Sequence, residues 1–253
     1  VFTSAYPNSK LVADAYYWIG KSAQNLGQSE EAIFNFEKVF SSYKNSELAS
    51  ASILEMGLIY RSSKNYDAAI NIYNRGISEL KKSAKIPEFQ YNKGMTLLEK
   101  NSFQEAYSVF EDVVMYNPGT VFGDKSKFEL ALIDIAAGRF ANADEYLTAL
   151  SENRTDDLGA KSQYYLGQSL FDQGKYNEAI TALVRVRTVY SRYEEWLMRS
   201  YLLLGDCYVK LNDRRNAAEM YRAVVTKYSG TPIGDEAQQK LRKVQWAKKY
   251  YWF

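Results

Sequence analysis

The amino-acid sequence predicts an all-α protein, a solenoid of stacked helical hairpins. Small residues recur along it every 36 to 38 residues, at Gly20, Gly57, Gly94, Ala131, Gly167 and Gly205. An alanine follows each of them twelve residues later, and the apolar residues around both positions keep helical spacing. A period of this length is typical of repeat arrays in which each unit contacts only its neighbours.

The small residues at these two positions have a physical reason. Without bulky side chains there, the two helices of a hairpin pack at close range. Aromatic side chains such as Phe36 and Phe110 then fill the groove beside them. We expect a leucine in place of Ala179 or Ala217 to overpack the contact, at a cost of about 1–3 kcal/mol.

The first repeat illustrates the expected elements. One helix runs from Leu11 to about Leu26 and stops at Gly27, and a second runs from Ser29 to Tyr43. Ser29 is the expected N-cap of the second helix, because a serine there can accept a hydrogen bond from a free backbone N–H. The breaks in the later repeats are expected at Asn65, Asn101, Gly138, Gly174 and Asn212.

The same register sets the domain boundaries. Residues 1–9 are interpreted as the end of a preceding repeat, so we expect the chain to belong to a longer protein. Six repeats are expected over residues 10–46, 47–84, 85–121, 122–157, 158–193 and 194–232. Residues 233–253 are expected to form a capping helix, from about Gly234 to Tyr251, that covers the apolar end of the array. The tail Tyr250-Tyr251-Trp252-Phe253 either packs back or marks a continuation.

This pattern of small and large residues resembles the tetratricopeptide (TPR) repeat, and all six units fit part of it. The usual TPR spacing is about 34 residues, so each repeat here is extended by a few residues. The long-period form, with Tyr6-Pro7-Asn8-Ser9 followed by Ala13 to Gly20, is similar to TPR segments of bacterial envelope proteins. These are the Tol-Pal-associated periplasmic proteins and the outer-membrane assembly lipoproteins.

The resemblance implies a right-handed superhelical solenoid that acts as a non-enzymatic scaffold. Its partner would be a protein or peptide held on a concave face. The implied location is the periplasm or the outer membrane of a bacterium, with the cytoplasm as the alternative. A membrane would be reached only through an N-terminal anchor that is missing from this sequence.

The resemblance also assigns inner-face positions, which lie three before, one after and four after the first small residue of each repeat. The candidate groove residues at these positions are Tyr17, Leu54, Leu58, Tyr91, Met95, Leu98, Phe128, Leu132, Ile135, Tyr164 and Phe171. The other inner-face positions hold Lys21, Gln24, Arg61, Gln168, Leu202, Asp206 and Val209. Repeats two to four are thus expected to present a nearly continuous apolar strip, suited to an amphipathic helix or an extended peptide.

Two alternatives to a peptide groove remain open. The strip can be buried by the curvature of the array, or it can be a self-contact of a homo-oligomer. A clamp for a C-terminal carboxylate is excluded, since Tyr17 and Tyr91 stand where such a clamp requires Lys or Asn.

Composition argues against catalysis. The chain has no histidine, which is the commonest general base near neutral pH and the commonest metal ligand. Cys207 is the only cysteine, so no intramolecular disulfide forms, and we expect a small buried hydrophobe. No glycine-rich phosphate loop is present. We therefore expect no cofactor, no metal and no small-molecule substrate.

The charge distribution leaves one less favoured function open. The net charge is only +2, but residues 185–253 hold 14 Lys/Arg and 7 Asp/Glu, whereas residues 1–184 hold 18 and 23. The basic third contains an arginine–tyrosine cluster that would suit nucleic acid, namely Arg185, Arg187, Arg192 and Arg199 with Tyr190 and Tyr193. The alternative interpretation is that these charges form an ordinary solvent-exposed face with no binding role.

Overall fold

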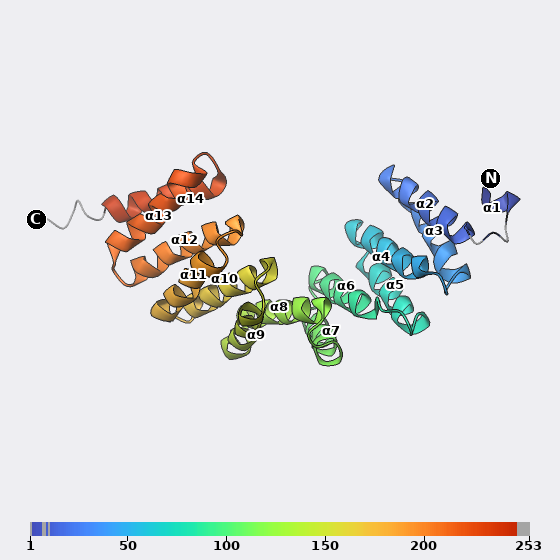
Figure 1. Cartoon of the computed structure of the whole chain (residues 1–253), viewed down its shortest axis with the longest axis horizontal. Coiled ribbons are helices and arrows are strands. Elements are labelled where there is room, and N and C mark those ends of the chain that lie inside the picture. The colour runs from blue at the N-terminus through green and yellow to red at the C-terminus, as the bar shows by residue number, and fades with distance from the viewer. Residues whose placement is uncertain (1, 7–8, 10, 247–253) are drawn as a thin grey trace, which may run out of the picture. The chain divides into compact units, whose positions relative to one another are not determined.

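The computed structural model describes residues 2–6, 9 and 11–246, and each regular element within these ranges is an α-helix (Figure 1). The all-α prediction is therefore confirmed. The chain divides into two compact units, residues 1–126 and 127–253, and we describe each by itself. Pro7 and Asn8, and the tail from Tyr250 to Phe253, lie outside the described residues.

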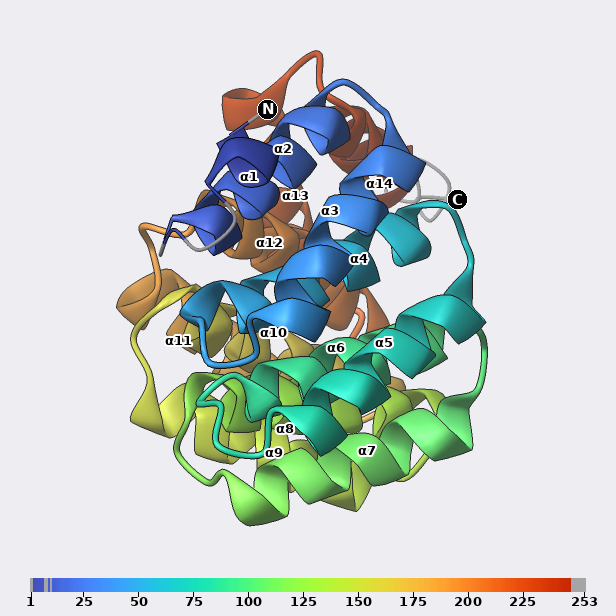
Figure 2. The ribbon, with the colours of Figure 1, turned by 90° about the vertical axis from the view of Figure 1, so that its right-hand side faces the viewer.

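The first unit is a run of helix pairs. Its helices are α1 (Phe2–Ala5), α2 (Val12–Asn25), α3 (Ser29–Ser42), α4 (Glu47–Ser62), α5 (Tyr66–Glu79), α6 (Ile86–Glu99), α7 (Phe103–Tyr116) and the beginning of α8 (Val121–Ala136). From α1 to α7 each helix packs against the next along the chain, and α4 also contacts both α2 and α6. In Figure 2 the second helices of the pairs, α3, α5 and α7, run in roughly the same direction. This arrangement is that of a repeat array.

The second unit continues the same plan. After the remainder of α8 it contains α9 (Phe140–Asn153), α10 (Asp157–Asp172), α11 (Tyr176–Val189), α12 (Glu194–Lys210), α13 (Arg214–Tyr228) and α14 (Pro232–Trp246). The expected terminal helix is present as α14, which begins two residues before Gly234. Its Ala237 and Leu241 pack against Ala217, Tyr221 and Val224. The expected end of this helix at Tyr251 lies outside the described residues.

Each hairpin turn contains one residue in the left-handed conformation, seven positions after the first small residue. These residues are Gly27, Lys64, Asn101, Gly138, Gly174 and Asn212, with φ between 59° and 77°. The next backbone N–H donates to a carbonyl five residues earlier, as from Asn65 to Tyr60 at 2.8 Å. This bond closes the Schellman motif that ends many helices. The predicted breaks are confirmed, although the left-handed residue in the second repeat is Lys64 rather than Asn65.

The expected N-cap at Ser29 is wrong. Helix α3 begins at Ser29 itself, and Gln28 occupies the N-cap position without a side-chain hydrogen bond. The left-handed turn at Gly27 directs the chain into the helix one residue earlier than the capping pattern predicts. In the second repeat Asn65 does cap α5, since its side-chain oxygen accepts from the Ala68 N–H at 3.3 Å.

The turn at Lys64 yields a stability prediction. A residue with a Cβ at positive φ is strained, and glycine relieves that strain. We expect Lys64→Gly to raise the free energy of unfolding by about 0.5–1 kcal/mol, measured by urea denaturation. The exposed substitution Lys38→Gly, inside α3, should lower it by about 1 kcal/mol. An unchanged or lower stability of Lys64→Gly would contradict the strain at this turn.

The small residues carry out the predicted packing role. A methyl group placed on Gly57 would lie 2.3 Å from the ring of Tyr73, and one on Gly94 would lie 2.5 Å from the ring of Phe110. In each repeat the large partner stands sixteen residues after the small residue. The alanines twelve residues after it are fully buried, at Ala32, Ala69, Ala106, Ala143, Ala179 and Ala217.

Candidate functional site

In the first unit the inner-face positions lie on α2, α4 and α6, which pack side by side. Tyr17 and Tyr91 stand at the same register two repeats apart, with Leu54 between them. The Tyr17 ring lies 5.5 Å from that of Phe36, and the Tyr91 ring lies 5.9 Å from the equivalent Phe110. All three inner-face side chains are half-buried, and the Tyr91 ring is also contacted from the next repeat by Phe122 at 5.6 Å and by the Lys125 Nζ at 5.8 Å.

Leu58 differs from its neighbours, because this large aliphatic side chain is 53% exposed. It lies next to a hollow of about 330 Å³ lined by Leu58, Arg61, Ser62, Lys64, Tyr66 and Glu99. Two of the predicted inner-face residues, Leu58 and Arg61, therefore share one hollow formed by the end of α4, the start of α5 and the end of α6. Met95 and Leu98, on α6, are half-buried.

Ion pairs join the first helices of successive repeats. The Lys21 Nζ donates to Glu55 Oε1 at 2.8 Å, which ties α2 to α4. Arg61 donates to Glu99 Oε1 at 2.5 Å and, through a second nitrogen, to Asn92 Oδ1 at 3.4 Å, which ties α4 to α6. These contacts hold the spacing of the three helices and therefore the spacing of the apolar positions between them.

The pKa values of nearby groups follow from these contacts. Burial, with a smaller contribution from the Glu55 charge, raises the pKa of Tyr17 above its ordinary value. Burial alone would lower the pKa of Arg61, but the hydrogen bond and charge of Glu99 outweigh it and raise the pKa. Burial raises the pKa of Tyr73, beneath Arg61, to about 12. All three groups keep their usual protonation near neutral pH.

In the second unit Phe128 does not belong to an accessible groove, and its assignment there is wrong. The Phe128 side chain is only 1% exposed. The centre of its ring lies 5.4 Å from the centre of the Tyr165 ring and 4.2 Å from the Lys161 Nζ. The core of its own hairpin, together with these residues of the following repeat, buries Phe128. The inner-face residue Leu202 is also buried.

The remaining predicted groove residues of the second unit are half-buried. Leu132 and Ile135 pack against the core formed by α8 and α9. Tyr164 lies 5.8 Å from Trp196, and burial raises its pKa to about 12. Phe171 lies against Tyr176 at 5.4 Å. The continuous strip expected over repeats two to four runs from one unit into the other and remains a prediction.

Asp206 shows that a polar inner-face position can serve the fold. Its carboxylate accepts from the Lys240 Nζ at 2.7 Å and from the Tyr221 hydroxyl at 2.7 Å. Lys240 lies on α14, so the network attaches the last helix to α12 and α13. Burial, together with the hydrogen bond to Asp206, raises the pKa of Tyr221, and its hydroxyl therefore stays a donor.

The arginine–tyrosine cluster is largely engaged within the protein. Arg187 stacks on the Tyr201 ring at 4.7 Å, and Arg199 pairs with Glu195 at 3.1 Å. Arg192 donates to the Thr155 carbonyl at 2.8 Å. Contacts of this kind compete with phosphate binding, so the structure adds no support for a nucleic-acid function.

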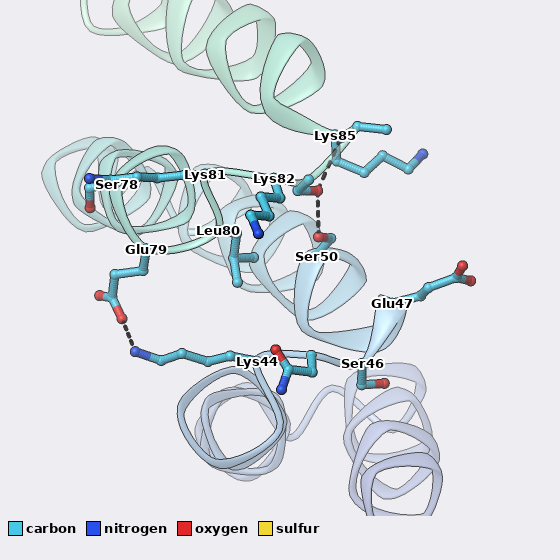
Figure 3. A pocket seen from close by; sticks show the side chains of 13 residues that line it. Lys44, Ser46, Glu47, Ser50, Ser78, Glu79, Leu80, Lys81, Lys82 and Lys85 are labelled. Carbon is cyan, nitrogen blue, oxygen red and sulfur yellow. Dashed lines mark hydrogen bonds and ion pairs between the residues drawn. The ribbon is translucent and has the colours of Figure 1, made fainter.

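A second hollow, of about 930 Å³, was missed by the sequence reasoning. It lies at the connectors α3–α4 and α5–α6, at the opposite ends of α4, α5 and α6 from the hollow beside Leu58 (Figure 3). Its lining includes Lys44, Lys81, Lys82 and Lys85. The signal in the sequence was the dense run of lysines after α5, which resembles an ordinary solvated loop.

Two kinds of feature are absent from the described residues. None of their helices reaches the length and hydropathy that a membrane span requires. Over the same part of the chain, no group of three or more His, Cys, Asp or Glu residues is arranged to hold a metal ion.

Comparison with protein families decides the classification. Models of the tetratricopeptide repeat match residues 13–46, 51–79 and 87–120 in the first half of the chain. Further models of the same repeat match residues 128–187 and 160–228. The chain belongs to the tetratricopeptide repeat family. This TPR fold is a scaffold for protein–protein interaction, and the family is generally non-enzymatic.

One named protein is similar in sequence to part of this chain. Photosystem I assembly protein Ycf3 of Synechococcus sp. (strain CC9605) is 30% identical over 122 residues, which are 42% of this chain and 68% of Ycf3.

Solved structures are similar over most of the TPR chain. PilW, described as a widely conserved type IV pilus biogenesis factor, has a TM-score of 0.63 at 16% identity, covering 91% of this chain and all of PilW. PilF of Pseudomonas aeruginosa has a TM-score of 0.59 at 20% identity, covering 90% and 97% of the two chains. YrrB, described as a TPR protein with an unusual peptide-binding site, has a TM-score of 0.58 at 18% identity, covering 81% and 97%. At these identities the likeness is one of fold.

Proposed function

We propose that this TPR protein is a non-enzymatic scaffold that binds a protein or peptide through the inner-face positions of its first unit. The observation that carries the proposal is the exposed Leu58 beside a hollow that also contains Arg61 and Glu99. An apolar side chain next to a few fixed polar groups is the usual composition of a binding site, in which apolar contact supplies affinity and polar groups orient the ligand.

The regular spacing of the inner-face residues suits a ligand of extended or helical shape. Tyr17, Leu54 and Tyr91 offer equivalent contacts on three successive first helices. Because Lys21 and Arg61 are already paired with Glu55 and Glu99, the cations on this face are largely neutralised. A partner with apolar side chains at regular intervals therefore fits this face better than a highly charged one.

The proposed role is in the assembly of a larger complex in a bacterial envelope, at the periplasm or the outer membrane. Support comes from the names of similar proteins, since Ycf3 is called an assembly protein and PilW a biogenesis factor. Fractionation of cells that express the natural protein tests the location. Recovery with the cytoplasmic proteins would contradict an envelope role and leave the binding function intact.

The binding proposal is tested by replacing the apolar side chain of Leu58 with a negatively charged one. We expect Leu58→Glu to weaken binding about tenfold or more, since a carboxylate would be desolvated against an apolar ligand beside Glu99. Twelve-residue peptides are first selected from a displayed library on the wild-type chain. Their dissociation constants are then measured by fluorescence polarisation with the wild type and the variant.

Phe103→Glu supplies the matched control. Phe103 opens the second helix of its pair, α7, and is 54% exposed, so the substitution introduces the same charge at the same exposure away from the inner face. Its affinity should stay within twofold of the wild type. Equal losses in both variants, or none in Leu58→Glu, would contradict a site at this face.

The alternative of a homo-oligomer is answered by sedimentation of the same proteins. The exposed Leu58 would suit a self-contact as well as a ligand. A wild-type chain that sediments as a monomer at micromolar concentration excludes this alternative. A dimer that dissociates in Leu58→Glu would replace the peptide-binding proposal.

A further inference from the structure

The hollow of about 930 Å³ in the first unit has a lining dominated by lysine and serine. Its cations are Lys44, Lys81, Lys82 and Lys85, and its hydroxyls are those of Ser46, Ser50, Ser78 and Ser83. In Figure 3 the Lys82 ammonium points into the space between α4 and the end of α5, whereas Lys81 extends toward Ser78 and Lys85 extends outward on the other side. Lys81 is exposed, and exposed side chains change rotamer within nanoseconds, so Lys81 can turn toward a ligand in the hollow.

Carboxylates pair with two of these lysines, Lys44 with Glu79 and Lys85 with Glu88 at 2.9 Å, so the local charge of the hollow rests on Lys81 and Lys82. Glu79 accepts from Lys44 at 2.7 Å and from Arg75, on the outer side of α5, at 3.4 Å. The hydrogen bond from Lys44, the largest influence, lowers the pKa of Glu79, so the pair persists near neutral pH. Glu47 is exposed and extends away from Lys82 (Figure 3). Lys82 thus faces a space in which the Glu79 carboxylate is already paired with Lys44.

A serine pair supplies a directed donor. The hydroxyls of Ser50 and Ser83 lie 2.8 Å apart and share one hydrogen bond, and the Lys85 backbone N–H donates to Ser83 Oγ at 3.1 Å. Only one of the two hydroxyl hydrogens is used between the serines, so the other can donate to a ligand oxygen. Ser50 is largely buried and lies in α4, which fixes the position of the serine pair.

The helix ends near the hollow contribute little net field. The C-termini of α3 and α5 carry partial negative charges, and the N-termini of α4 and α6 carry partial positive charges. These contributions oppose one another, so the lysines determine the sign of the potential. A lysine after a helix C-terminus is by itself a common stabilising feature, which explains Lys81. It does not explain the hollow, the serine pair or Lys82 pointing inward.

We propose that this hollow binds a phosphate-bearing ligand. A phosphate group has several acceptor oxygens and up to two negative charges, which match ammonium and hydroxyl donors arranged around one space. The cations of the lining are lysines, which bind phosphate oxygens as compact point charges. A space of this size holds a diphosphate or a phospholipid headgroup. The site lies apart from Leu58, so the phosphate-binding proposal does not depend on the proposed peptide function.

The test measures binding of three probes to the whole chain. Inorganic pyrophosphate and hexaglutamate are titrated by calorimetry, and vesicles containing 30% phosphatidylglycerol are tested by co-sedimentation against pure phosphatidylcholine vesicles. The variants are Lys81→Gln/Lys82→Gln and Ser50→Ala. We expect pyrophosphate or the anionic vesicles to bind, and we expect the lysine variant to weaken that binding at least tenfold, with Ser50→Ala weakening it about threefold.

Lys38→Gln/Lys93→Gln is the matched control, since it removes the same charge from α3 and α6 outside the hollow. It should retain binding within twofold. Pyrophosphate binding assigns a soluble phosphate compound, and binding of vesicles alone assigns a lipid headgroup; either result supports the proposal. Failure of both probes, equal losses in the control, or equal affinity for hexaglutamate would overturn it. Circular dichroism confirms that each variant is folded.

Discussion

Replacing Phe110 by alanine is expected to lower the free energy of unfolding by about 3–5 kcal/mol. Phe110 is fully buried, and its ring occupies the space that the missing side chain of Gly94 leaves open, with 2.5 Å between the ring and a methyl built on that glycine. Gly94→Ala should in turn cost about 1–3 kcal/mol, because its methyl meets the ring. Urea denaturation followed by circular dichroism measures both changes.

The double variant separates a specific pair from two unrelated defects. In Gly94→Ala/Phe110→Ala the new methyl has no ring to meet and fills part of the cavity. The combined cost should therefore be smaller than the sum by at least about 1 kcal/mol. The neighbouring Met95→Ala combined with Phe110→Ala provides a reference pair, because Met95 is half-buried and its truncation leaves the glycine contact unchanged. Strict additivity at Gly94 and Phe110 would contradict the packing role of the small residue.

Cys207 is expected to react with iodoacetamide roughly a thousandfold more slowly in the folded protein than an ordinary thiol at pH 8. It is fully buried among Leu204, Leu183 and Met220. Burial, and secondarily the Asp206 charge, raises the pKa of its thiol from 9.0 to about 12. Only the thiolate reacts, so at pH 8 the reactive fraction falls by about the same factor as the acid constant.

The labelling experiment needs no second variant, because the chain has a single cysteine. Mass spectrometry follows the modified fraction in native buffer and in 8 M urea, where the rate should become that of a free thiol. Rapid labelling under native conditions would show that the contact between α12 and α13 opens readily, and it would contradict the packing described for this hairpin.

The repeat could be predicted from sequence because its determinants are local. Gly57 and Tyr73 belong to one hairpin and are sixteen residues apart, so their pairing is visible as spacing. The turns were predictable for the same reason, since Gly27 and Gly174 are the residues best suited to positive φ. Lys64 was not, because nothing in its side chain favours that conformation. Its geometry is imposed by the helices on either side.

The candidate site was predictable only in part. Leu54, Tyr91 and Phe128 occupy the same register and have similar hydrophobicity, so a pattern within one repeat treats them alike. Phe128 is buried in the core between α8 and α9, and Lys161 and Tyr165 of the next repeat add to its cover. Contacts between repeats depend on side chains some 35 residues apart. The spacing of the repeat does not specify how large those side chains are. The lysine- and serine-lined hollow is likewise formed by two connectors, of which each alone is an unremarkable polar loop.

The constant distance of seven residues between the small residue and the left-handed turn has a genetic consequence. Lys64 and Asn101 are equivalent turn positions 37 residues apart. A recombination event that deleted or duplicated the codons between two such positions would keep the sequence spacing between the small residue, the turn and the large partner unchanged. Proteins of this design can therefore change length by whole units in a single event, whereas a shift of one codon would place a bulky residue where two helices meet.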